Sequence, residues 1–243
     1  MKTFDTINRF LQISLHERGK RSAEDESPGI RPFVTISRQA GAGGHTLAEA
    51  LIKAFAEQED EDLFGEWQMF DQNLVEMVAA SPDLKVSLEG LLSEEYSTRT
   101  DDFFRQILSA TTAQDMVMLR IFRLVRSLAE VGKVIIVGRA GSQVTQDFGP
   151  SVSVRLIAPE EVRLRRMMDQ YQLAEKQARA LIHKHDTGRA RLIKRHFKVN
   201  VDDPLLYDVT WNTEEVNLQA IAQAIAAVLR NRAASFHTVE RTQ

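Results

Sequence analysis

A glycine-rich turn is the first stretch of the sequence whose residue types could do chemistry. Gly41, Gly43 and Gly44 follow an apolar run at 33–37 and lead into residues 44–57, which have the apolar periodicity of a helix. Glycine adopts positive φ easily and lets a ligand approach the backbone, so successive N–H groups here could wrap an anion. The positive end of the following helix would add to that attraction. The pattern predicts a phosphate-binding loop, with Gly41, Ala42, Gly43, Gly44, His45 and Thr46 as the binding residues.

Two residues of this loop depart from those of an ordinary P-loop. Arg38 stands where the first framework glycine is expected, and Gly44 stands where the lysine is expected. We expect Arg38 to supply the missing charge, because a guanidinium is always charged and can bind two phosphate oxygens. His45 is the second candidate. Thr46 could offer its hydroxyl to Mg²⁺, and the alternative is a plain strand–helix turn in which Thr46 only begins the helix.

Arg139 and Asp71 each follow an apolar run that predicts a strand. Ligands of open α/β sheets bind at the carboxyl ends of the strands. We therefore expect Arg139 to contact a substrate phosphate, and Asp71 to contact a substrate hydroxyl or a Mg²⁺-bound water. The alternative for Arg139 is a surface arginine paired with a carboxylate, and the alternative for Asp71 is a carboxylate that caps a helix.

A basic stretch at 186–200 could close cations over a transferring phosphoryl group, whose charge needs electrostatic stabilisation. Five cations lie within ten residues: Arg189, Arg191, Lys194, Arg195 and Lys198. We expect Arg189 and Arg191 to be the residues that close. The alternatives are a solvated helix face and a patch that contacts RNA. Phe197 is the one aromatic residue in this stretch, which argues against nucleic acid because single-strand binding relies on stacking side chains.

Apolar runs alternate with helical periodicity along the chain, which predicts an α/β domain with a parallel sheet. An amphipathic helix is expected at 1–16, a linker at 17–32, an irregular helical region at 86–112 and a frayed tail from 232. Strands are expected at 33–37, 67–70, 134–137, 151–158 and 207–213. Helices are expected at 44–57, 72–80, 113–131, 160–170, 173–185 and 215–231.

Composition narrows the class of protein. The 243 residues are 43% hydrophobic, enough for a sizeable core, and the net charge of −3 gives no general attraction to nucleic acid. Cysteine is absent, and no apolar run has the roughly 18 residues of a membrane span. The six histidines form no convincing metal-binding set. We expect a cytoplasmic protein without a membrane segment.

Several segments in order resemble the cytidylate kinase-like family of P-loop kinases. They are 35–44, 70–79, 134–141, 158–167, 186–191 and 202–213, so the resemblance spans about 33–230. It implies a five-stranded parallel sheet flanked by helices, with a helical substrate-binding insertion and a lid. It also implies ATP-dependent phosphorylation of a nucleoside monophosphate, CMP or dCMP above all, with ATP and Mg²⁺ as cofactors. By position, Gly41, Gly43 and Thr46 match the phosphate loop, Asp71 and Arg139 the substrate side, and Arg189 and Arg191 the lid.

The resemblance suggests a domain layout but leaves the acceptor open. We expect an N-terminal helix and linker at 1–32, a kinase-like domain at 33–232 and a tail at 233–243. Within the domain, we expect an insertion at 71–112 and a lid at 186–200. Ala140 stands where CMP kinases carry an Asp that helps to hold the nucleotide. Two alternatives follow: a nucleotide-binding regulator with weak or no kinase activity, and a kinase for a different small acceptor. The N-terminal helix either packs on the core or serves a homodimer.

Overall fold

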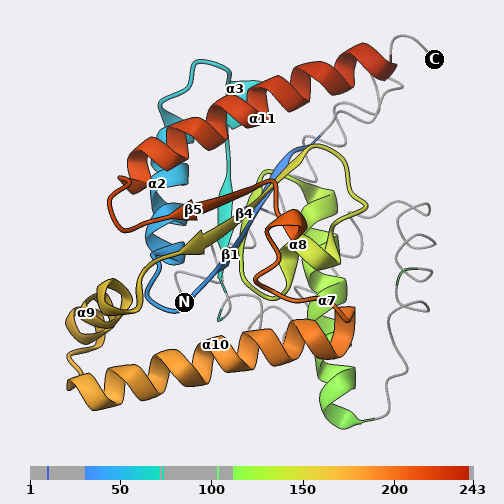
Figure 1. Cartoon of the computed structure of the whole chain (residues 1–243). Coiled ribbons are helices and arrows are strands. Elements are labelled where there is room, and N and C mark those ends of the chain that lie inside the picture. The colour runs from blue at the N-terminus through green and yellow to red at the C-terminus, as the bar shows by residue number, and fades with distance from the viewer. Residues whose placement is uncertain (1–9, 11–30, 72, 74–102, 104–111, 241–243) are drawn as a thin grey trace.

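The computed structural model describes residues 10, 31–71, 73, 103 and 112–240 (Figure 1). Its centre is a five-stranded parallel sheet in the order β2-β3-β1-β4-β5. The strands are β1 (Phe33–Arg38), β2 (Gln68–Phe70), β3 (Val134–Val137), β4 (Ser151–Ile157) and β5 (Val209–Asn212). The helices are α2 (Gly44–Ala56), α3 (Glu61–Phe64), α7 (Ala113–Val131), α8 (Gly141–Val144), α9 (Glu160–Tyr171), α10 (Glu175–Phe197) and α11 (Leu218–Glu240), with a 3₁₀ turn η1 at Pro204–Leu206.

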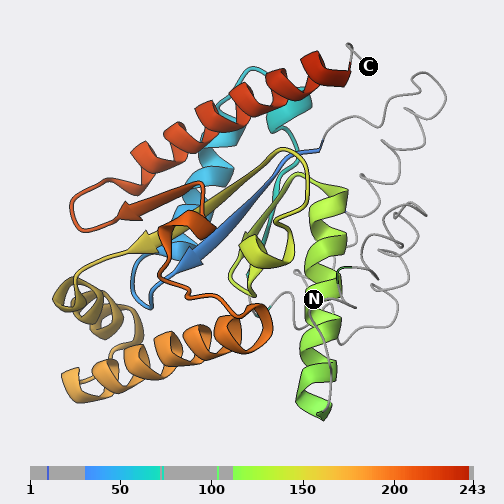
Figure 2. The same ribbon diagram turned by 45° about the vertical axis from the view of Figure 1, so that its right-hand side comes forward.

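Helices cover both faces of the sheet, as Figure 2 shows. Alternate residues of β1 point to opposite faces, so Val34 and Ile36 pack with α2 and α11, whereas Phe33 packs with α7. All four residues of β3 are buried, because the middle strands of the sheet are covered on both sides. The sheet is thus a rigid frame whose strand ends position the residues that follow them.

Most predicted elements agree with the structure to within one or two residues, and the helix at 113–131 and the strand at 134–137 match it at both ends. The predicted helices at 72–80 and 86–112 lie almost wholly outside the described residues. The final helix begins at Leu218 and continues to Glu240, beyond the predicted start of a frayed tail. Its alanine-rich sequence favours helix, and Ala233 is still buried.

The basic stretch at 186–200 differs most from the prediction, because it is mainly helical. The helix expected to end near 185 continues as α10 to Phe197. Ile193 and His196 are buried, and Phe197 packs against Phe122 of α7 with ring centroids 5.5 Å apart. Arginine and lysine are good helix formers, so these tertiary contacts suffice to continue the helix through the basic run.

Helix α10 passes beneath the carboxyl ends of the strands, from α9 at one side to α7 at the other (Figure 1). At its α9 end, Ala178 and Ile182 pack with Leu164 and Met167. At its α7 end, Arg195 forms an ion pair of 2.8 Å with Asp115, a residue of the α7 capping box. Contacts at both ends hold the middle of α10 opposite the loop that follows β1.

Phe10 is the one residue of the predicted N-terminal helix that the structure describes. Its side chain is buried and meets Phe70 at the end of β2, with ring centroids 5.8 Å apart. This contact favours packing on the core at that residue, and the predicted homodimer stays a prediction. Among the described helices, none is both long enough and apolar enough to cross a membrane.

Candidate phosphate-binding site

The loop between β1 and α2 has the backbone geometry of an anion cradle. Gly41 and Gly43 have φ angles of +79° and +89°, in the region that favours glycine. A Cβ on Gly41 would lie 2.7 Å from the carbonyl oxygen of Arg163, so no larger residue fits there. Gly43 caps α2 without a side-chain hydrogen bond, and the amides of the first turn of a helix have no intrahelical acceptor. The lack of intrahelical acceptors favours phosphate binding by these amides, which stays a prediction.

Two polar side chains hold the carbonyl side of this loop. The Thr213 hydroxyl, just after β5, donates to the carbonyl of Ala42 at 3.0 Å. Arg166 of α9 donates to the Thr213 hydroxyl at 3.0 Å and to its carbonyl at 2.6 Å. Because the carbonyls are held from one side, the amides of the loop can point the other way. Sequence reasoning did not single out either residue, since neither stands in a local pattern that marks a loop contact.

Asp186 of α10 joins the loop to two arginines. Its carboxylate accepts a 2.7 Å hydrogen bond from the Ala40 amide. It also accepts from Arg163 at 2.8 Å and from Arg189 at 3.1 Å. Arg163 in turn donates to the carbonyl of Ala40 at 3.1 Å. Asp186 therefore fixes the middle of α10, and with it Arg189, against the phosphate loop.

Arg38 crosses the site from the end of β1 to the end of β3. Its aliphatic stem passes close to Gly44, as the 3.0 Å distance from a Cβ added at Gly44 to Arg38 Cγ shows. Its guanidinium lies against Gly138, where an added Cβ would be 2.0 Å from Arg38 Nη1. Within the described part of the chain, Arg38 makes neither a hydrogen bond nor an ion pair. The arginine predicted to replace the P-loop lysine therefore lies beside Gly44 and Gly138.

Four arginines from four different elements influence one another here: Arg38 after β1, Arg139 after β3, Arg155 on β4 and Arg189 on α10. Burial lowers the pKa of Arg38 to about 9, with repulsion from Arg189 and Arg139 adding to the effect and Asp71 opposing it. Burial followed by repulsion from Arg189 also lowers the pKa of Arg139. Burial likewise lowers the pKa of Arg189, against the attraction of Asp186. An anion bound here would favour the charged forms of these arginines.

Arg139 stands in a strained turn between β3 and α8. Gly138, Arg139 and Ala140 have consecutive φ angles of +86°, +55° and +57°. A non-glycine residue in this region typically costs about 1–3 kcal/mol and is found where the surroundings impose it, often at functional sites. The turn keeps Arg139 half-buried near Arg189, at the carboxyl edge where it was predicted.

Asp71, His45 and Thr46 lie at the rim of the site. His45 Nδ1 is 3.9 Å from the Asp71 carboxylate, and its Nε2 is 3.6 Å from that of Glu49. Thr46 is exposed in the first turn of α2. The described residues contain no group of three or more His, Cys, Asp or Glu side chains that could hold a metal by themselves. A Mg²⁺ ion at Thr46 would thus take its other ligands from phosphate and water.

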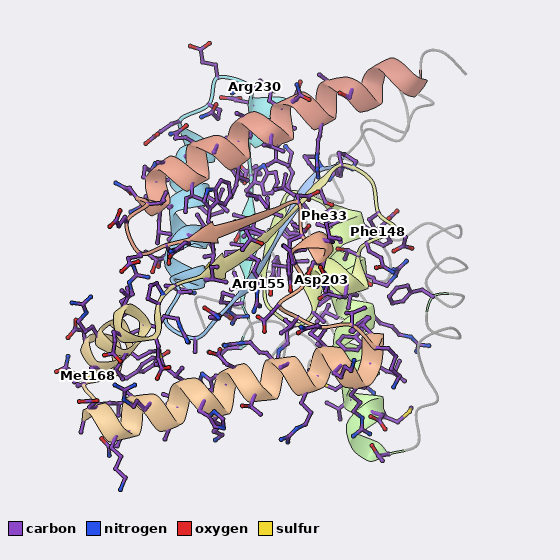
Figure 3. All side chains as sticks on the ribbon, in the orientation of Figure 1. Phe33, Phe148, Arg155, Met168, Asp203 and Arg230 are labelled. Carbon is purple, nitrogen blue, oxygen red and sulfur yellow. The ribbon has the colours of Figure 1, made fainter. Side chains whose placement is uncertain are left out.

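Arg155 is a buried polar residue that sequence reasoning missed. It donates to the Ser37 hydroxyl at 2.9 Å and to Asp202 at 2.6 Å, and its guanidinium lies 5.7 Å from the centre of the Tyr207 ring. Figure 3 shows this side chain between the sheet and α10. A single charged residue inside the strand predicted at 151–158 was the signal that could have identified it.

Arg191 is the one predicted site residue that lies away from the cluster. The inward face of α10 carries Ile182, Asp186, Arg189 and Ile193, which recur at helical spacing. Arg191 is off this face and exposed. Its predicted role in phosphoryl transfer therefore stays a prediction, with no contact in the structure to support it.

The fold and the site together define a P-loop kinase-like protein: a parallel sheet in the order 2-3-1-4-5 with a glycine cradle between its first strand and the next helix. A family model described as the cytidylate kinase-like family matches residues 33–215. The chain therefore belongs to that family, as its sequence motifs indicated.

One solved structure agrees with this at the level of the fold. An uncharacterised protein from Eubacterium ventriosum is similar with a TM-score of 0.60 and 18% identity, over 83% of this chain and 100% of that one. Shikimate kinase from Acinetobacter baumannii, in complex with shikimate, matches with a TM-score of 0.41 and 14% identity, over 84% of this chain and 95% of its own. Shikimate kinase from Bacteroides thetaiotaomicron matches with a TM-score of 0.41 and 11% identity, over 86% of this chain and 99% of its own. Among curated proteins there is no significant sequence match.

Proposed function

We propose that this protein transfers the γ-phosphoryl group of ATP to a nucleoside monophosphate, with CMP or dCMP as the favoured acceptor. Membership of the cytidylate kinase-like family supports the reaction class. The proximity of Arg38, Arg139 and Arg189 to one another, with Arg38 beside Gly44 of the glycine cradle, carries the proposal. Phosphoryl transfer is catalysed mainly by positioning and by stabilising charge on the transferring group, which is what such a cluster can do.

Each part of the site has a role in this proposal. The amides of 41–46 bind the phosphates of ATP, with Arg38 in place of the P-loop lysine. Thr46 and water would hold Mg²⁺, which neutralises phosphate charge and orients the phosphate oxygens when bound. Arg139 binds the phosphate of the acceptor, and Asp71 contacts its hydroxyl or a metal-bound water. Arg189, held by Asp186, stabilises the transferring group.

A panel of acceptors tests the proposed reaction. CMP, dCMP, UMP, AMP and GMP are supplied in turn with MgATP, and ADP release is followed by a coupled assay. We expect the highest kcat/KM with CMP or dCMP. Turnover with none of the five, at enzyme concentrations that give a clear signal for a reference kinase, would contradict the proposal.

Ala140 favours one alternative, a kinase for a different small acceptor. This residue lies in the strained turn beside Arg139, and its methyl group cannot accept the hydrogen bonds that an Asp there would accept. A wider set of phosphorylated and unphosphorylated small acceptors separates this alternative from the first. ATP binding without transfer to any acceptor would instead favour a nucleotide-binding regulator.

A further inference from the structure

Gly44 is small because another side chain uses its space. A Cβ on Gly44 would lie 3.0 Å from Cγ and 3.2 Å from Cδ of Arg38, closer than ordinary van der Waals contact. Gly44 is the first residue of α2 and has no positive φ, so its backbone conformation suits any residue. Glycine also weakens a helix relative to alanine. The reason for a glycine at this position is therefore the stem of Arg38 and not the backbone.

Gly138 bounds the other end of the same side chain. A Cβ there would approach Nη1 of Arg38 to 2.0 Å and Cζ to 3.0 Å. The residue also has a φ of +86°, so two independent constraints favour glycine. Gly44 at the start of α2 and Gly138 after β3 thus lie against the stem and the guanidinium of Arg38, respectively.

We propose that Gly44 and Gly138 are positioning residues that form a slot for Arg38, and that an arginine at 38 and a lysine at 44 are mutually exclusive ways to bring a cation to the loop. This inference rests on the proposed function, because it gives the slot a purpose in phosphate binding. It explains why Arg38 stands in place of the P-loop glycine and Gly44 in place of the P-loop lysine, because each change requires the other. A lysine side chain at 44 would begin in the volume that the Arg38 stem occupies.

A double-mutant cycle on binding tests the slot. Affinities for MgATP and for inorganic pyrophosphate are measured by calorimetry on the full chain, with Gly44→Ala, Arg38→Ala and the double variant. We expect Arg38→Ala to weaken binding about tenfold and Gly44→Ala about threefold, since contacting residues couple in such cycles. In the Arg38→Ala background, Gly44→Ala should change affinity by less than about 1.5-fold. Equal losses in both backgrounds would overturn the proposal.

Two further variants separate the slot from general damage. Gly188→Ala adds a methyl group to an exposed helical glycine where no atom lies within 4 Å, and it should leave both affinities within about twofold. The exchange variant Arg38→Gly/Gly44→Lys should bind pyrophosphate at least about fivefold more tightly than Arg38→Gly alone. An exchange variant no better than the single variant would count against mutual exclusion.

Failure of the slot and failure of the proposed function give different results. A wild-type chain that binds MgATP and shows the coupled cycle, yet transfers phosphate to no acceptor, would support the slot and reject the kinase. Transfer to CMP with additive effects of the two substitutions would support the kinase and reject the slot. A wild-type chain that binds neither ligand would overturn both.

Discussion

Arginines are buried in two regions of this protein, and the two regions treat their charge in opposite ways. Between α7 and α8, the Arg126 side chain has no exposed surface. Its guanidinium donates to both carboxylate oxygens of Asp147, at 2.8 and 2.9 Å, and to the carbonyl of Val144 at 2.7 Å. The rings of Phe103 and Phe148 lie 4.3 and 4.4 Å from it. Every feature of this region compensates the buried charge.

At the phosphate loop, Arg155 and Arg189 are paired with Asp202 and Asp186, whereas Arg38 lacks such compensation. Arg38 has neither a hydrogen bond nor an ion pair within the described residues, and burial, with repulsion from Arg189 and Arg139, lowers its pKa. A buried charge that is fully paired serves the fold, whereas an excess of like charges costs stability unless an anion binds. The difference supports the proposal that the phosphate loop is the ligand site, whereas Arg126 is a structural residue.

Arg126→Ala should have the largest effect, and that effect should be on stability. The substitution removes a buried ion pair and leaves a space between two rings, which should lower the free energy of unfolding by about 3–5 kcal/mol. Urea unfolding measures this directly. Arg120→Ala, at an exposed position of the same helix, is the control and should stay within about 0.5 kcal/mol. If Arg126→Ala lowers the free energy of unfolding by less than about 1 kcal/mol, Arg126 is not the structural residue that this comparison requires.

Arg38→Ala should lower phosphoryl transfer at least tenfold, about 1.4 kcal/mol of transition-state stabilisation. The physical reason is the loss of a buried cation close to the glycine cradle. Steady-state kinetics with the best acceptor of the panel measures it. An unchanged kcat/KM would remove Arg38 as the replacement for the P-loop lysine.

The stability of Arg38 variants should change in the direction opposite to that of Arg126→Ala. The folded-state pKa of Arg38 lies below its ordinary value, so at neutral pH its charged form costs stability that returns only as pH rises above about 9. Arg38→Met keeps the apolar stem and removes the charge. Its Tm without ligand should rise, by about 2–4 °C for each kcal/mol relieved. A clear fall in Tm would mean that the charge is compensated after all.

Arg189→Ala and Arg191→Ala should differ in their effect on kcat, although only one residue separates the two positions. Arg189 faces the site and pairs with Asp186, so its loss should lower kcat by about fivefold, roughly 1 kcal/mol. Arg191 is exposed on another side of α10, so its loss should lower kcat by less than about twofold. Equal effects would show that α10 rearranges during turnover to bring both arginines to the substrate.

The smallest effect should be a dependence of binding on pH. Arg38 binds phosphate when it is protonated, and its pKa in the free protein is about 9. Affinity for pyrophosphate should therefore be constant below that pH and about twofold weaker at pH 9, continuing to fall above it. The Arg38→Ala variant should lack this decline. The same decline in both proteins would assign it to another group.

Local patterns were enough to predict the sheet and the loop but not the contacts that complete the site. The strand at 134–137 is recognisable because four consecutive apolar residues suit a strand buried on both faces. The helical nature of 186–197 was missed, because it depends on Ile193, His196 and Phe197 meeting α7 and not on the basic run itself. Charged stretches look alike in sequence whether they form a loop or a docked helix.

The sequence alone determined the order of strands and helices along the chain and the position of the glycine cradle at 41–44. It also determined the strand ends that carry Arg38, Asp71 and Arg139. These features depend on residue type, on spacing and on the rule that ligands bind at the carboxyl edge of a parallel sheet. Only the tertiary structure decided which cations meet. Asp186 binds the Ala40 amide across 146 residues, and the guanidinium of Arg38 reaches Gly138 across one hundred. Contacts of this range follow from the packing of α10 and β3 against β1, which no local pattern records.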